Sequence, residues 1–96
     1  MRGLVEQPGV SEAVDKAGSK WKRAEDAWDA ITWVVARDPK AGRPVTESGK
    51  TRELVFDGAR SIDMPTIRLT YEIGNPEIIL HEAIFEDAPY HQAGHG

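Results

Sequence analysis

Hydrophobic residues recur at steps of three and four between residues 20 and 38, and this spacing predicts the main helix of the chain. The helix should end at Asp38-Pro39, because the residue before a proline disfavours the α conformation. Ser19 is its expected N-cap, and a shorter helix is expected just before it, over residues 12–17. Trp33 falls off the apolar stripe. The stripe itself, which we expect to supply much of the core, comprises Trp21, Ala24, Ala27, Trp28, Ile31, Val34 and Val35.

Strict alternation of apolar and polar residues over 67–73 predicts a β-strand with one buried face. A tight turn at 74–76 leads to a second, more apolar strand over 78–85. A third strand is expected over 51–56 and a weak one over 3–7. Short connections favour an antiparallel meander. The predicted fold is therefore α+β, with two N-terminal helices packed on one face of a small antiparallel sheet of three to four strands.

A length of 96 residues predicts one domain, residues 1–96, with a connecting loop over 38–50 and a flexible tail over 88–96. No apolar run approaches the roughly 20 residues of a membrane span. The N-terminal residues show no apolar signal segment, and cysteine is absent. These features predict a cytoplasmic protein with no membrane partner.

The charge distribution narrows the choice of partners. The net charge is -4, which argues against a generic nucleic-acid binder. Residues 1–48 hold eight basic and eight acidic side chains, whereas residues 49–96 hold four basic and eight acidic ones, with no Lys or Arg after Arg68. A polyanion site would have to use the segment before residue 69, backbone amides or histidines.

The C-terminal third carries the residues from which a metal or acid–base site would be built. These residues are His81, Glu82, Glu86, Asp87, His91 and His95. Their spacing matches no known metal module, and His81 and Glu82, as strand neighbours, should point to opposite faces. We therefore predict no metal and no cofactor. The adjacent carboxylates Glu86 and Asp87 form either an acid–base pair or a solvated strand end.

Arg68 is the most informative single residue, because it lies in the middle of the strand whose apolar residues should face the helices. It is therefore expected on the open face of the sheet. One interpretation is a cross-strand ion pair with Glu53, Glu72 or Glu82. The other is an anion site, because a guanidinium can bind a phosphate through two parallel hydrogen bonds.

Three short motifs resemble the RelE/ParE toxin superfamily. The run IRLTYEI at 67–73 is similar to its YRLxYxI strand, and DPKAGRPV at 38–45 is similar to the DPxxGxPL segment that follows its second helix. The run TREL at 51–54 resembles its xRELR strand. The resemblance spans roughly residues 4–87. It implies a small antiparallel sheet with two helices, and a toxin that a cognate antitoxin protein wraps and neutralises.

For RelE-like members the resemblance implies ribosome-dependent cleavage of mRNA, an endoribonuclease activity. It places the catalytic candidates at Arg68, Arg60, Tyr90 and His91. The candidates for phosphate or RNA binding are Arg52 and Lys50. This chain departs from the pattern at Phe85-Glu86-Asp87, where ribonuclease members carry basic, His or Tyr residues. Tyr90 and His91 would replace those residues only if the tail folds back over the sheet.

Three hypotheses follow from these observations. The first is a RelE-like toxin that acts on the ribosome and mRNA. The second is a ParE-like gyrase inhibitor, or a catalytically silent member that acts by protein contacts. The third is a small interaction module without toxicity. The open face and the sheet edges would be covered by an antitoxin segment or by a second copy in a homodimer.

Overall fold

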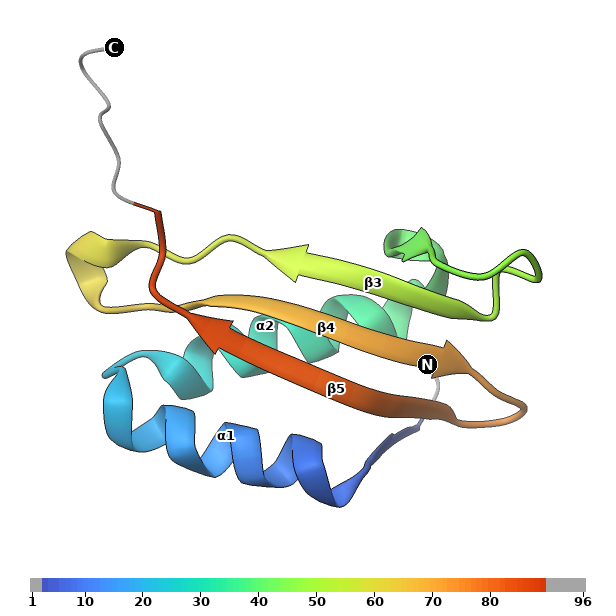
Figure 1. The fold of residues 1–96 in the computed structure, drawn as a ribbon, viewed down its shortest axis with the longest axis horizontal. Helices are drawn as coiled ribbons and strands as arrows, with labels where there is room; N and C mark the ends of the chain where they lie inside the picture. The colour runs from blue at the N-terminus through green and yellow to red at the C-terminus, as the bar shows by residue number, and fades with distance from the viewer. Residues whose placement is uncertain (1–2, 90–96) are drawn as a thin grey trace, which may run out of the picture.

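The computed structural model describes residues 3–89, which form a five-stranded sheet with two helices packed against it (Figure 1). Helices α1 and α2 span Pro8–Lys20 and Ala24–Arg37. The strands are β1 (Leu4–Glu6), β2 (Arg43–Pro44), β3 (Thr51–Phe56), β4 (Thr66–Ile73) and β5 (Ile78–Glu86). Two short 3-10 turns, Pro39–Ala41 and Arg60–Ile62, complete the elements of these residues. The predicted α+β class is confirmed.

The sheet has the strand order β1-β5-β4-β3-β2, which differs in two ways from the expected three or four antiparallel strands. A fifth strand, β2, consists of only two residues and pairs with Arg52 and Glu53 of β3. The edge strand β1 runs parallel to β5. The meander β3-β4-β5 is antiparallel, as its short turns predicted. Helices α1 and α2 connect β1, at one edge of the sheet, to β2 at the other edge.

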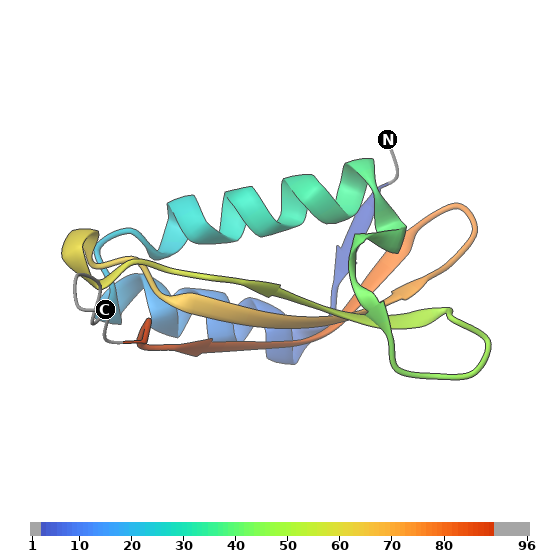
Figure 2. The ribbon, with the colours of Figure 1, turned by 90° about the horizontal axis from the view of Figure 1, so that it is seen from above.

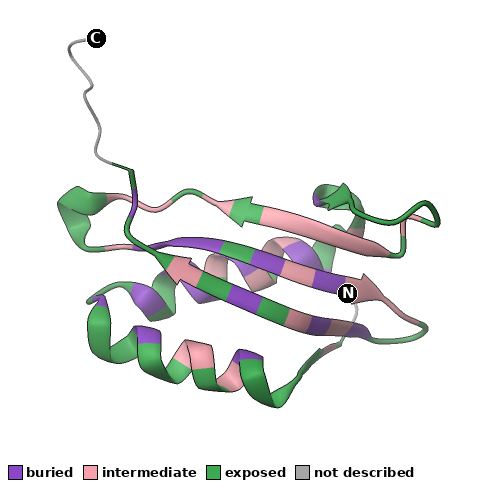
Figure 3. Ribbon diagram, in the orientation of Figure 1, coloured by how far each residue is buried: buried purple, intermediate pink, exposed green. Residues whose placement is uncertain are grey.

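Seen edge-on, the sheet has α2 on one side, and α1 runs alongside β5 (Figure 2). Burial alternates along β4, as the sequence pattern requires (Figure 3). Ile67, Leu69 and Tyr71 are fully buried against the helices. From the predicted stripe, Val34 is half-buried and the other members are buried, while Trp33 is 57% exposed.

The boundary between the helices differs from the prediction. Helix α1 continues through Gly18 and Ser19, and α2 begins only at Ala24, so Ser19 is no N-cap. Trp21 instead adopts an extended backbone (φ -120, ψ 134), and its indole N–H donates to the Asp87 carboxylate at 2.9 Å. The side chain and carbonyl of Asp63 accept the Lys22 and Arg23 amides. The end of α1 at Lys20 is therefore fixed by contacts with Asp63 and Asp87, which are distant in the sequence.

Within the described residues, no helix has the length and apolar character needed to cross a membrane. Ala88 is buried beyond the end of β5, and Pro89 is exposed. The rest of the predicted flexible tail, residues 90–96, lies outside the described residues.

Candidate functional site: the open face of the sheet

Arg68 lies on the face of the sheet that the helices leave uncovered, where the sequence placed it. Its Nε donates to Oε1 of Glu86 at 2.8 Å, and both side chains are nearly half exposed. The hydrogen bond that Arg68 donates to Glu86, together with the negative charge of that carboxylate, raises the pKa of the Arg68 guanidinium. The predicted cross-strand ion pair therefore exists, but its partner is Glu86 rather than Glu53, Glu72 or Glu82. The register pairs Thr66 with Glu86, which brings that carboxylate diagonally next to Arg68.

Two apolar side chains flank Arg68 on the same face. The strand register pairs Arg68 with Val55 of β3 and with Ile84 of β5. Val55 is 41% exposed and Ile84 is 45% exposed. The three residues thus form a row across the middle of the open face, with a half-exposed isoleucine and valine on either side of a guanidinium. We call Val55, Arg68 and Ile84 the central row.

Acidic side chains surround the central row. Strand alternation and register place the carboxylates of Glu53, Glu72, Glu82 and Glu86 on the open face. The cations of the described sheet on this side are Arg68 and Arg43, and Arg43 is paired with Glu53 at 2.9 Å. Carboxylates therefore outnumber guanidiniums. The open face therefore has a small apolar centre that is surrounded by negatively charged side chains.

A β-bulge in β5 adds a histidine to this face. Thr70 pairs with Glu82 and Tyr71 pairs with Leu80, so His81 is the extra residue between them. Its Nε2 lies 2.8 Å from Oε1 of Glu72, and its Nδ1 lies 3.2 Å from Oε1 of Gln7. The expectation that His81 and Glu82 point to opposite faces is therefore wrong, because the bulge resets the alternation between them.

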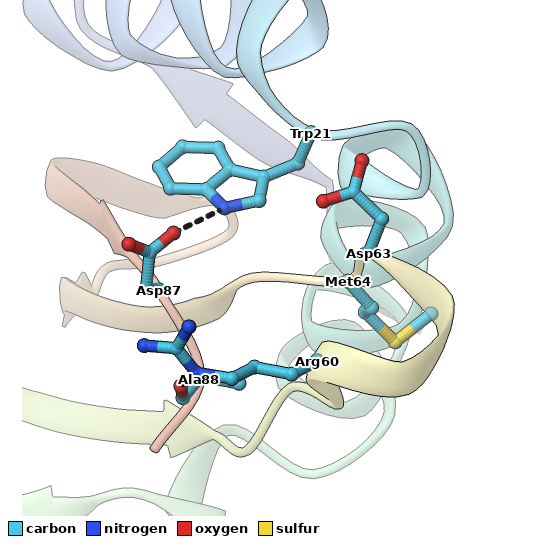
Figure 4. Close-up of a pocket in the computed structure, with 6 residues that line it drawn as sticks. All are labelled: Trp21, Arg60, Asp63, Met64, Asp87 and Ala88. Atoms are coloured by element: carbon cyan, nitrogen blue, oxygen red, sulfur yellow. Dashed lines mark hydrogen bonds between the residues drawn. The ribbon is translucent and has the colours of Figure 1, made fainter. Parts of the chain in front are cut away.

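Arg60 lies past the end of β5, in a small pocket next to Trp21 (Figure 4). Its Nε donates to the Ala88 carbonyl at 2.6 Å. Asp63 and Asp87 line the same pocket of about 120 Å³, so carboxylates outnumber its single guanidinium. Asp87 is engaged by the Trp21 indole N–H. The hydrogen bond between Trp21 and Asp87 joins the residues after β5 to the connection between the helices. The excess of carboxylates around the pocket does not favour binding of a phosphate.

Arg52 lies on the helix side of the sheet, opposite Tyr71 in the register. Its guanidinium donates to the carbonyls of Gly49 at 2.9 Å, Gly42 at 2.8 Å and Lys40 at 3.3 Å. Arg52 thereby holds the loop between α2 and β3 in place. It does not share a face with Arg68, and Lys50 lies exposed in the turn just before β3.

The predicted site residues are thus not gathered into one site within residues 3–89. Arg68 is on the open face, Arg60 is in the pocket past β5, and Arg52 is bonded to loop carbonyls. Tyr90 and His91 lie outside the described residues. The neighbouring acids Glu86 and Asp87 each have a separate partner, Arg68 and Trp21. Residues 3–89 contain no group of three or more His, Asp or Glu side chains arranged to hold a metal ion.

Sequence reasoning missed three features of this face: the Glu86 partner, the bulge at His81 and the exposed apolar pair Val55 and Ile84. The exposed pair could have been found in the sequence, because Val55 and Ile84 are apolar residues at outward-facing positions of their strands. Neither a protein-family model nor a curated protein sequence matches this chain.

Proposed function

We propose that this chain is a protein-binding module that acts through the open face of its sheet. The toxin motifs support placing it among RelE/ParE-type toxins that work by protein contacts, with a cognate antitoxin as one natural partner. The observation that carries this proposal is the pairing of Arg68 with Glu86 beside two exposed apolar residues.

The charge of the face opposes RNA and favours protein. Binding of nucleic acid depends on neutralising phosphates with Lys and Arg. Here the central guanidinium already has a carboxylate partner, and three further glutamates lie around it. An RNA phosphate would displace Glu86 and still meet the field of the others.

The same features suit a basic, partly apolar protein segment. Complementary charge speeds the encounter and selects among partners, while buried apolar side chains contribute most of the affinity. Val55 and Ile84 offer the apolar contact, and the exposed Glu82 would face a lysine or arginine of the partner. Such a partner covers a face that is otherwise exposed to solvent.

Regulated expression tests the proposal, with and without the gene that neighbours this one. We expect growth arrest that the neighbouring product relieves, while mRNA remains intact. In the purified complex, Glu82→Lys should weaken binding at least tenfold through repulsion of a basic partner. Glu47→Lys makes the same charge change in the exposed loop before β3 and should leave binding unchanged.

Two results would count against this function. Unaffected growth at high expression would remove the toxin assignment. A complex that tolerates Glu82→Lys as well as Glu47→Lys would remove the open face as its binding surface.

One observation favours a second candidate, ribosome-dependent RNA cleavage. His81 and Glu72 form a hydrogen-bonded pair on the same face as Arg68, and such a pair suits proton transfer beside a phosphate-binding guanidinium. This function requires translation-dependent mRNA cleavage that disappears in both His81→Ala and Arg68→Ala. Intact mRNA during growth arrest would exclude it.

A further inference from the structure

A groove runs between α1 and β5, away from the central row of the open face. Its apolar lining comprises Ala13, Ala17, Trp21 and Phe85. The groove exists because α1 presents alanines where larger side chains would cover Phe85. Its volume is about 260 Å³, slightly below the roughly 300–1,000 Å³ typical of small-molecule sites. A volume of this size suits one or two apolar side chains of a peptide.

The floor of the groove is held rigidly. The Trp21 ring stacks on Phe85 with centroids 6.4 Å apart, and the Trp28 ring is tilted against Phe85 with centroids 5.9 Å apart. The Trp21 indole N–H is fixed by Asp87. Trp21 is itself only 8% exposed, so the aromatic surface that a partner meets is mainly the half-buried Phe85, which is preformed and would lose little binding energy to rearrangement.

The rim of the groove is basic in a protein of net charge -4. Lys16 and Lys20 lie one helical turn apart along it. The Lys20 ammonium is 4.7 Å from the centre of the Trp21 ring. Lys16 has only a long contact of 3.9 Å with Glu12, and both of those side chains are mostly exposed, so this pair is weak. Both ammonium groups can donate hydrogen bonds to a carboxylate of a ligand.

We propose that this groove binds an acidic amphipathic helix of a partner protein. Its apolar side chains lie on Phe85 and Trp21, and carboxylates spaced i, i+4 pair with Lys16 and Lys20. The opposite charge of the two surfaces separates this site from the open face, which suits a basic segment. The inference does not depend on the proposed function.

The test uses the full-length chain and a synthetic amphipathic helix with leucines on one face and glutamates beside them. An otherwise identical peptide with lysines in place of the glutamates is the control ligand. Binding is followed by NMR through the Trp21 indole N–H and the amides of Ala13 and Ala17. We expect saturable shifts at these positions with the glutamate peptide, weakened by added salt, and at least tenfold weaker binding of the lysine peptide.

Variants locate the site. The double change Lys16→Glu and Lys20→Glu should weaken binding of the glutamate peptide at least tenfold, whereas Lys50→Glu, at a distant turn, should change it less than twofold. Ala13→Leu should fill the groove and abolish the shifts while the charge of the rim stays the same. Equal binding of both peptides, or shifts confined to Val55 and Ile84, would overturn the proposal. Because Glu82→Lys should not affect this site, failure here is distinguishable from failure of the open-face function.

Discussion

The hydroxyl of Tyr71 donates a hydrogen bond to the carbonyl of Pro39, 2.5 Å away, and accepts one from the Gly42 amide at 3.0 Å. The side chain is fully buried and belongs to β4, the middle strand of the sheet. The contact therefore fastens the segment that follows α2 to the middle of the sheet. It joins residues 38–45 to residues 67–73, and so gives both of these sequence motifs a structural role in this chain.

Removing this hydroxyl should destabilise the protein. Tyr71→Phe keeps the ring but leaves the Gly42 amide and the Pro39 carbonyl without their partner. We expect the free energy of unfolding to fall by about 1–3 kcal/mol. Urea denaturation followed by tryptophan fluorescence measures the change. Thr70→Ala, at the adjacent half-buried position on the other face, is the matched control and should cost less. Equal stability of wild type and Tyr71→Phe would contradict the role.

The same residue should make stability depend on alkaline pH. Burial raises the pKa of the Tyr71 phenol, with Asp38 adding to the effect, while the Gly42 amide and Arg52 oppose it. The folded state therefore holds the phenolic proton more tightly than the unfolded chain, in which tyrosine titrates near pH 10. The contribution of the protonated Tyr71 phenol to stability is complete below about pH 10, and it is lost as the pH rises toward the pKa of the phenol in the folded state.

Denaturation at about pH 8 and about pH 11 checks this sign. The stability difference between wild type and Tyr71→Phe should shrink at the higher pH, because only wild type loses stability through this group. A difference that stays constant or grows would show that the buried phenol does not retain its proton.

Arg52 should matter for stability through the shape of its guanidinium, not through its charge. Three loop carbonyls share its N–H groups, and a single ammonium cannot reproduce that fork. Arg52→Ala and Arg52→Lys should both lower the free energy of unfolding by about 1–3 kcal/mol. Arg43→Ala removes an exposed pair with Glu53 and should have little effect. Full stability of Arg52→Lys would indicate that charge alone is required.

The regular elements were predictable because their period reflects which side is buried. The stripe from Trp21 to Val35 and the alternation from Ile67 to Ile73 identify buried core residues, except that Val34 and Ile73 are only half-buried. The end of α1 was not predictable. It depends on Trp21 meeting Asp87, 66 residues away, and on Lys22 meeting Asp63, 41 residues away. No local pattern around Gly18 encodes either contact.

The candidate site was less predictable than the fold. Alternation placed Arg68 on the open face, but its partner depends on strand register, which brings Glu86 rather than Glu53 next to it. The bulge that turns both His81 and Glu82 outward inserts a residue without a turn signal in the sequence. Local periodicity predicts on which face of the sheet a side chain lies. Which side chains pair across neighbouring strands depends on the register of the assembled sheet.

Two glycines with opposite surroundings provide the last prediction. A Cβ at Gly42 would lie 2.7 Å from the Tyr71 hydroxyl and 2.8 Å from the Glu53 carbonyl, whereas a Cβ at Gly18 would meet nothing within 4 Å. Gly42→Ala should therefore disturb the Tyr71 contact and cost about 1–3 kcal/mol. Gly18→Ala, within α1, should stabilise the protein by about 0.5–1 kcal/mol through helix propensity. Thermal denaturation of both variants measures the two changes in stability. Unchanged or increased stability of Gly42→Ala would show that the close approach at Gly42 does not constrain the fold.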